Sequence, residues 1–141
     1  MVDLLCIQLA GERYAVRLND AAMLVAGRVV VPVPSAAPAL LGLVGIRGAV
    51  VPAFSLAVLL GQQQATGAPR WLIVCGTGDP IALGFSDFDG HVRLPITSVY
   101  PDVNPRAARQ YVHQLASTDN GTLAVINIPL VIATIRNRIG Q

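Results

Sequence analysis

The residue types that carry acid–base, nucleophilic or metal chemistry are few in this sequence and lie far apart. The two histidines, His91 and His113, stand in separate strand-like runs, where a surface or hydrogen-bonded structural role is the ordinary one. The two cysteines, Cys6 and Cys75, have neither the CxxC nor the Cys–His spacing that zinc sites use. We therefore expect no metal, no cofactor and no catalytic residue among them.

One short motif looks like part of a hydrolase site. Residues 84–88 (GFSDF) resemble half of a nucleophile elbow around Ser86, but the second glycine and the strand-to-helix context are missing. Asp87 and Asp89 lie two residues apart, which alone makes neither a calcium loop nor a glycosidase pair. A chain without lysine also cannot form a Walker motif. An enzyme is the least expected class.

Composition predicts a globular protein of one domain, or of two very small ones that share a core. Of the 141 residues, 53% are hydrophobic and 13% charged, and the mean hydropathy is +0.57, so disorder is excluded. The net charge is +2, and the ten basic residues are all arginines without a run, which argues against nucleic acid as a partner. Free buried thiols and the lack of a secretory signal pattern favour a cytoplasmic location.

The high hydropathy also raises the question of a membrane span. Residues 29–46 are an uncharged stretch of eighteen residues, long enough for a transmembrane candidate. Pro32, Pro34 and Pro38 interrupt it, and each would remove a helix hydrogen bond where hydrocarbon offers no substitute. We expect no direct membrane insertion, and an apolar surface that binds protein partners.

Short strand-like runs separated by turn residues dominate the pattern. Residues 4–10 and 13–18 predict a hairpin that turns at Gly11-Glu12. Pro52 should confine its own strand to an edge or a bulge, and residues 39–44 fit either a helix or a strand. Seven further runs are typical of strands: 28–33, 48–54, 70–75, 81–85, 91–94, 111–116 and 122–128.

Helices are expected mainly near the two ends of the chain. Asn19-Asp20 can cap a single helical turn through Ala26, and residues 102–109 look like a loop that passes into a short helix. Asn127 can cap a C-terminal helix with Pro129 in its first turn. The apolar positions of that helix recur at helical spacing: Val131, Ile132, Ile135 and Ile139.

About nine short strands, roughly ten residues apart, with one terminal helix, predict small β-barrels or a sandwich. The polar segment 62–69 divides these strands into two comparable groups, so two small packed barrels are the simplest arrangement. Within residues 28–61, Arg47 is the only interior charge and lies between Ile46 and Gly48. A lone arginine there usually marks a loop that reaches solvent, and less often a contact with a partner.

The proline and glycine pattern resembles the CheW family of chemotaxis coupling proteins. The central part keeps the family spacing without a gap: Pro32-Val33-Pro34, Pro38, the run 42–48 (GLVGIRG) and the run 50–56 (VVPAFSL). The resemblance continues on both sides and covers nearly the whole chain, with the opening hairpin, Arg93-Leu94-Pro95, Tyr111 and the run 121–128. The resemblance implies an all-β fold of two packed five-stranded SH3-like barrels with a short C-terminal helix. Residues 1–141 would form one CheW-like domain of two intertwined subdomains, connected near 62–69.

The same resemblance implies a non-catalytic adaptor. It would couple the cytoplasmic tip of chemoreceptors to the regulatory domain of a CheA-type histidine kinase, in chemotaxis or related motility signalling. The alternative is a diverged module that serves a type IV pilus or another two-component pathway. The partner-binding residues implied are Gly42, Ile46, Arg47 and Gly48, although both glycines could equally serve tight turns.

Several polar positions of the family pattern hold small or apolar residues here. Gly45 stands where the family has Asn, Ser55 where it has Asp, Met23 where it has Glu, and Asn127 where it has an acidic residue. Because charged rim residues largely set which partner is accepted, these departures bear on partner choice.

Overall fold

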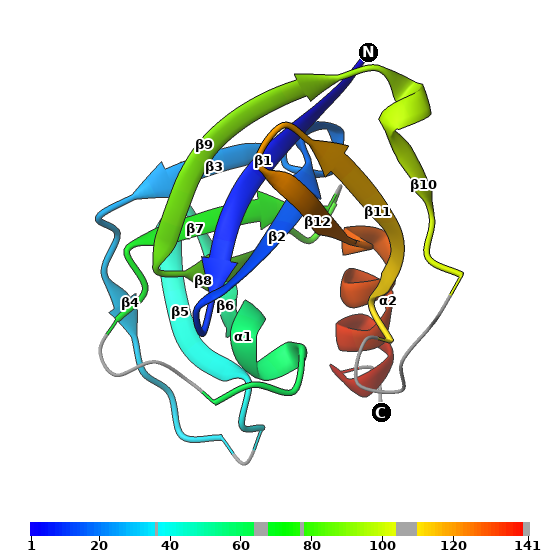
Figure 1. Ribbon diagram of the computed structural model, residues 1–141. Helices are drawn as coiled ribbons and strands as arrows, with labels where there is room; N and C mark the ends of the chain where they lie inside the picture. Colours follow the sequence, from blue (N-terminus) through cyan, green and yellow to red (C-terminus); the bar gives the residue numbers. More distant parts are fainter. Residues whose placement is uncertain (36, 64–67, 77, 104–109, 140–141) are drawn as a thin grey trace.

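The computed structural model describes residues 1–35, 37–63, 68–76, 78–103 and 110–139, which fold into two β-sheets (Figure 1). Among these residues the first sheet has six strands, in the order β10-β11-β12-β2-β1-β9. Their bounds are Val2–Leu9 (β1), Glu12–Arg17 (β2), Asp87–Leu94 (β9), Val99–Pro101 (β10), Val112–Thr118 (β11) and Gly121–Ile126 (β12).

The second sheet also has six strands in the described part of the chain, in the order β3-β7-β8-β6-β5-β4. Their bounds are Met23–Ala26 (β3), Val30–Val31 (β4), Leu40–Ile46 (β5), Ala49–Ser55 (β6), Trp71–Cys75 (β7) and Ile81–Phe85 (β8). The helices are Leu56–Leu59 (α1) and Ile128–Ile139 (α2), with two 3₁₀ turns at Leu18–Asp20 (η1) and Ile96–Ser98 (η2).

The predicted fold class is confirmed: strands in two packed SH3-like units dominate, and one short helix closes the chain. The units differ from the expectation in having six strands each. Within the described residues, the edge strands β10 and β9 do not pair with each other, nor do β3 and β4, so the sheets are open.

The chain crosses between the sheets twice, from β2 to β3 and from β8 back to β9. Each sheet contains one parallel pair, β12 with β2 and β6 with β8, where strands distant in sequence meet. The polar segment at 62–69 therefore joins α1 to β7 within the second sheet and does not divide the strands between the sheets. The polar composition of this segment predicts a connection between elements, but composition carries no information on which strands pair.

Two local predictions on the N-terminal third differ from the structure. Residues 23–26, expected in a helical turn, form strand β3, and all four pair with β7. Helical structure stops at η1 because pairing along the sheet edge satisfies this backbone in place of helical hydrogen bonds. The first hairpin turns at Ala10-Gly11, one residue earlier than expected, and both residues have positive φ, 50° and 82°.

Strands β4 to β6 show which element forms in the middle segment, where the sequence fitted either a helix or a strand. Residues 39–44 contribute to a strand, β5, while the expected strand at 28–33 shrinks to the two residues of β4. Pro52 lies in β6, which has neighbours on both sides, but the parallel pairing with β8 begins only at Ala53. At Pro52 the strand is paired on one side only, opposite Leu43. The proline therefore lies where its missing N–H leaves no neighbouring strand unpaired, as the edge or bulge prediction required.

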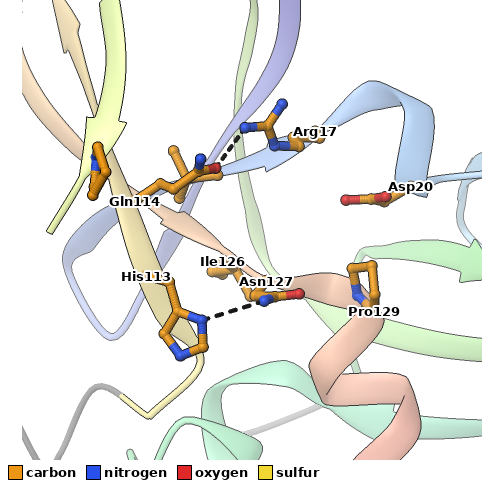
Figure 2. Close-up of a pocket in the computed structure, with 9 residues that line it drawn as sticks. Arg17, Asp20, His113, Gln114, Ile126, Asn127 and Pro129 are labelled. Carbon is orange, nitrogen blue, oxygen red and sulfur yellow. Dashed lines mark hydrogen bonds between the residues drawn. The ribbon is translucent and has the colours of Figure 1, made fainter. Parts of the chain in front are cut away.

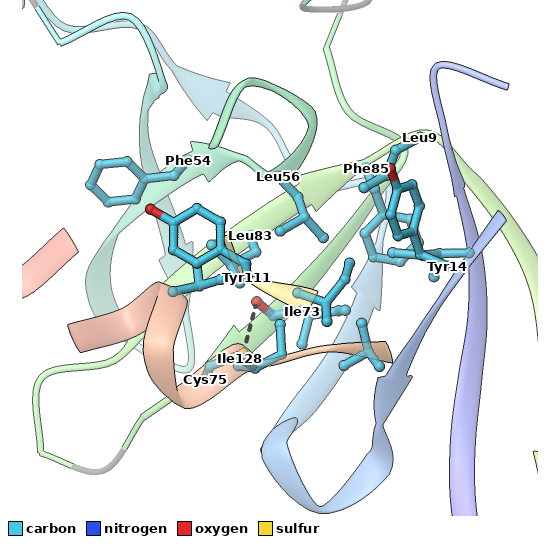
Figure 3. Close-up of a cluster of buried hydrophobic side chains, with 14 of the residues drawn as sticks. Leu9, Tyr14, Phe54, Leu56, Ile73, Cys75, Leu83, Phe85, Tyr111 and Ile128 are labelled. Carbon is cyan, nitrogen blue, oxygen red and sulfur yellow. Dashed lines mark hydrogen bonds between the residues drawn. The ribbon is translucent and has the colours of Figure 1, made fainter. Parts of the chain in front are cut away.

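A single large apolar cluster joins the two sheets (Figure 3). Tyr14 enters it from the first sheet, Phe54 and Leu83 from the second, and Ile128 from α2. Each sheet has a smaller cluster of its own behind this one. Trp71 of β7 and Phe88 of β9 add an aromatic contact between the sheets, with ring centroids 5.1 Å apart. Because apolar burial dominates stability, we expect the two halves to unfold together.

The C-terminal helix forms as its capping signal predicts. The Oδ1 of Asn127 accepts a hydrogen bond from the backbone N–H of Leu130 at 3.1 Å, and Pro129 lies in the first turn. Val131, Ile132 and Ile135 are buried in the large shared cluster, as their spacing predicted. The side chain of Ile139 and residues 104–109, where a short helix was expected, lie outside the described set. No helix in the described residues is long and apolar enough to span a membrane.

Candidate functional site

Arg47 and Gly48 form the two-residue turn between β5 and β6. Both have positive φ, 49° and 78°, as a type I′ turn requires. Arg47 and Ala10 are the only described residues other than glycine in this conformation. Because the flanking pair Ile46 and Ala49 closes the ladder directly behind the turn, the guanidinium side chain of Arg47 projects from the exposed tip of the hairpin.

The other two sequence-predicted partner residues face the opposite way. Ile46 is 5% exposed and belongs to the apolar cluster of the second sheet. Gly42 is buried, and a Cβ atom there would lie 2.1 Å from the backbone oxygen of Val31. The structure thus brings Arg47 and Gly48 together at a surface, while Ile46 and Gly42 support the hairpin from inside.

The outward side of the same hairpin carries an apolar surface that the sequence reasoning missed. We call the exposed side of β4, β5 and β6 the outer face; its members are Val31, Leu43, Gly45, Val50 and Pro52. Val31 lies opposite Leu43, Leu43 opposite Pro52, and Gly45 opposite Val50. Exposed and buried positions alternate along β5, but its sequence is apolar throughout, so no alternation of polar and apolar residues marked the exposed side. A continuous apolar sheet face in water is typical of a docking surface.

A groove of about 340 Å³ runs between the two sheets. The first sheet contributes Leu9 and the Ala10-Gly11 turn, and the second contributes Leu41 and Gly84 among others. A Cβ on Gly84 would come within 2.9 Å of Pro69, so the glycine allows the close packing at this wall. The groove is mainly apolar in its lining and open to solvent.

A second hollow, of about 460 Å³, lies beside the N-terminus of α2 (Figure 2). Its polar groups are already engaged with each other: Arg17 donates to the Oε1 of Gln114, and the Nδ2 of Asn127 lies 3.4 Å from the Nδ1 of His113. Burial raises the pKa of the Asp20 carboxyl, and the Arg17 guanidinium partly offsets this. Among the described residues that line the hollow there is no Ser, Thr, Cys or Lys.

The remaining chemistry-bearing residues are dispersed or buried. His91 of β9 contacts the Oδ1 of Asp3 at 2.9 Å on an exposed surface of the first sheet. Cys6 and Cys75 are free and buried in different clusters, and burial raises the pKa of both thiols, that of Cys75 to about 12. In the described residues no three His, Cys, Asp or Glu side chains gather as a metal site would require.

The departures from the family pattern fall into two structural groups. Met23 packs against the core of the second sheet, Ser55 is buried with its Oγ accepting from the N–H of Val58 at 3.3 Å, and Asn127 caps α2. These three serve the fold. Gly45, in contrast, is exposed on the outer face.

Comparison with known proteins gives the same assignment as the fold. A model of the CheW-like domain matches residues 3–136. Among solved structures, the scaffolding protein TtCheW from Thermoanaerobacter tengcongensis superposes with a TM-score of 0.77 at 19% sequence identity, covering 89% of this chain and 88% of that one. No curated protein matches the sequence. Because the family match spans nearly the whole of both sheets, the chain belongs to the CheW-like domain family.

Proposed function

We propose that this protein is a non-catalytic adaptor that couples the cytoplasmic tip of chemoreceptors to the regulatory domain of a CheA-type histidine kinase. The family match over residues 3–136 carries the proposal, because CheW-like domains act as scaffolds. The arrangement of surfaces supports it. A scaffold needs at least two separate docking surfaces, and the groove between the sheets and the outer face are distinct in shape and position.

Each surface suits one kind of partner. The groove, walled by both sheets, suits a helix of the receptor tip. Arg47, at the hairpin tip and outside the residues that line the groove, is proposed as a separate polar contact with the receptor. The outer face is flat and apolar and fits another β-domain, such as the kinase regulatory domain. We propose a cytoplasmic location, which also suits two free buried thiols.

Binding measurements with purified components test this function. The probes are the regulatory domain of the CheA-type kinase and a cytoplasmic receptor fragment from the same genome, titrated calorimetrically into this protein. We expect both to bind, and Arg47→Glu to weaken receptor binding by about tenfold without changing the thermal midpoint by more than about 2 °C.

The matched control is Arg93→Glu, which reverses an exposed arginine on the first sheet, away from both the hairpin tip and the residues that line the groove. We expect it to leave receptor binding within about twofold, since a surface charge outside the interface contributes little. The proposal is wrong if folded wild-type protein binds neither probe.

A further inference from the structure

Gly45 has no structural reason to be a glycine. Among the described glycines it alone combines a φ outside the left-handed region with open space around the position where a Cβ would be. By comparison, Gly48 has a φ of 78°, and Gly42 and Gly84 would clash with Val31 and Pro69. A glycine within a strand weakens the sheet, since it loses more backbone entropy on folding and contributes no side chain to packing.

The missing side chain leaves a notch in the outer face. Across the ladder from Gly45 stands Val50, which is 71% exposed, and two residues along β5 on the same side stands Leu43, which is 37% exposed. Side chains paired across neighbouring strands are about 5 Å apart and diagonal ones about 7–8 Å, so Leu43, Val50 and Pro52 border the gap above Gly45. Glycine inside a strand often marks a bulge, a tight bend, or a site where a ligand or another backbone approaches closely. The bulge of β5 lies between Leu40 and Gly42 and does not involve Gly45.

The segment that carries the notch has charges of one sign. Residues 21–78, which supply five of the six strands of the second sheet, contain three arginines (Arg28, Arg47 and Arg70) and no aspartate or glutamate. Arg47 lies two residues beyond Gly45, and Arg28 lies two residues before β4. A partner that covers this surface must therefore match an apolar centre and a basic rim.

We propose that the outer face receives the kinase regulatory domain through a bulky apolar side chain, such as Phe, Leu or Met, that inserts above Gly45, with a carboxylate of that domain beside Arg28. This inference rests on the proposed function and adds the chemistry by which one of its partners is recognised. A side chain at position 45 occupies the space that the inserting residue needs. Stability of the free protein and affinity for the partner should therefore respond to the same substitution in opposite directions.

Gly45→Thr tests the notch. Threonine favours strands and nothing surrounds the new Cβ, so we expect the thermal midpoint to rise by about 3 °C. Calorimetric titration with the kinase regulatory domain should show affinity lowered by about tenfold or more. The control is Ser117→Thr, an exposed position of β11 in the first sheet, which should leave affinity unchanged.

Arg28→Glu tests the basic rim in the same titration. We expect it to lower affinity by about threefold to tenfold at low salt, and less at high salt, because the rim charges are exposed and screened. Wild-type self-association is measured in parallel by sedimentation. Dimers that Gly45→Thr dissociates, without loss of kinase-domain affinity, would assign the notch to a second copy and overturn the inference.

Failure of the inference is distinguishable from failure of the proposed function. If the wild type binds the kinase domain and Gly45→Thr binds equally well, the inference is overturned and the adaptor function stands. If the wild type binds neither the kinase domain nor the receptor fragment, the proposed function is overturned and the inference falls with it.

Discussion

Gly42 of β5 passes so close to β4 that a Cβ atom on it would lie 2.1 Å from the carbonyl oxygen of Val31. Its φ of 149° and the register shift between Leu40 and Gly42 show that β5 bulges at this point. The close approach lets the two residues of β4 pair with β5, opposite Val44 and Leu43. A glycine assigned to partner binding by resemblance thus has a clear role in the fold itself.

Gly42→Ala should destabilise the protein strongly. The new Cβ would collide with backbone that cannot rotate away, so we expect the free energy of unfolding to fall by about 2–4 kcal/mol in urea denaturation. Gly45→Ala, in the same strand but with open space and no positive φ, is the control and should cost nothing. Equal urea midpoints for the two variants would contradict this account of Gly42.

Much of this fold could be predicted because the signals were local. The first hairpin, the last hairpin and the capped α2 each depend on turn or capping residues close in sequence. Met23 to Ala26 could not be placed correctly in this way, because what makes β3 a strand is its pairing with β7, about fifty residues later. The crossing of the chain between sheets depends on similar long-range pairing.

The candidate site was predictable in part. The family resemblance located the segment that carries Arg47, but neither its hairpin nor which of its residues face solvent. Ile46 faces inward and Gly45 outward, and a shift of one residue in register would reverse both. The outer face is assembled from β4, β5 and β6, whose alignment depends on the bulge at Leu40–Gly42. Residue order alone does not reveal such an alignment.

Substitutions at Arg47 can separate the effect of its charge from the effect of its left-handed backbone conformation. Asn tolerates the left-handed region, whereas Val does not, because its branched Cβ crowds the backbone there. We expect Arg47→Asn to keep the free energy of unfolding within about 0.5 kcal/mol and Arg47→Val to lower it by about 1–2 kcal/mol. Chemical denaturation measures both. A Val variant as stable as the Asn variant would show that the turn does not need this conformation.

Asn127 should stabilise the folded protein through the N-terminal cap that it provides for α2. Its Oδ1 accepts from the N–H of Leu130, so Asn127→Ala should lower the free energy of unfolding by about 1 kcal/mol. Asn127→Asp should retain stability, because aspartate caps equally well and its charge suits a helix N-terminus. Asn137→Ala, an exposed position late in the same helix, is the control and should be neutral or stabilising. Equal losses for Ala and Asp at position 127 would contradict a capping role.

The raised pKa of the Cys75 thiol predicts that the folded protein loses stability at alkaline pH. Burial, and then the charge of Asp20, raises the pKa of its thiol from about 9 to about 12, so the folded state holds this proton more tightly than the unfolded chain. The resulting stabilisation is complete below pH 9 and is lost as the pH rises toward 12. We therefore expect urea midpoints of the wild type to fall between pH 8.5 and pH 10.5.

Cys75→Ala should have a lower urea midpoint than the wild type at pH 8.5, because it leaves a small cavity in the cluster that joins the sheets. Its urea midpoint should fall less than that of the wild type between pH 8.5 and pH 10.5. Cys6→Ala is the matched control: burial raises the pKa of that thiol as well, but it lies in the separate cluster of the first sheet. Thiol labelling under native conditions should be slow for Cys75 and accelerate with urea, since the thiolate forms only where the core opens. Parallel pH profiles for wild type and Cys75→Ala would show that this thiol does not set the alkaline limit.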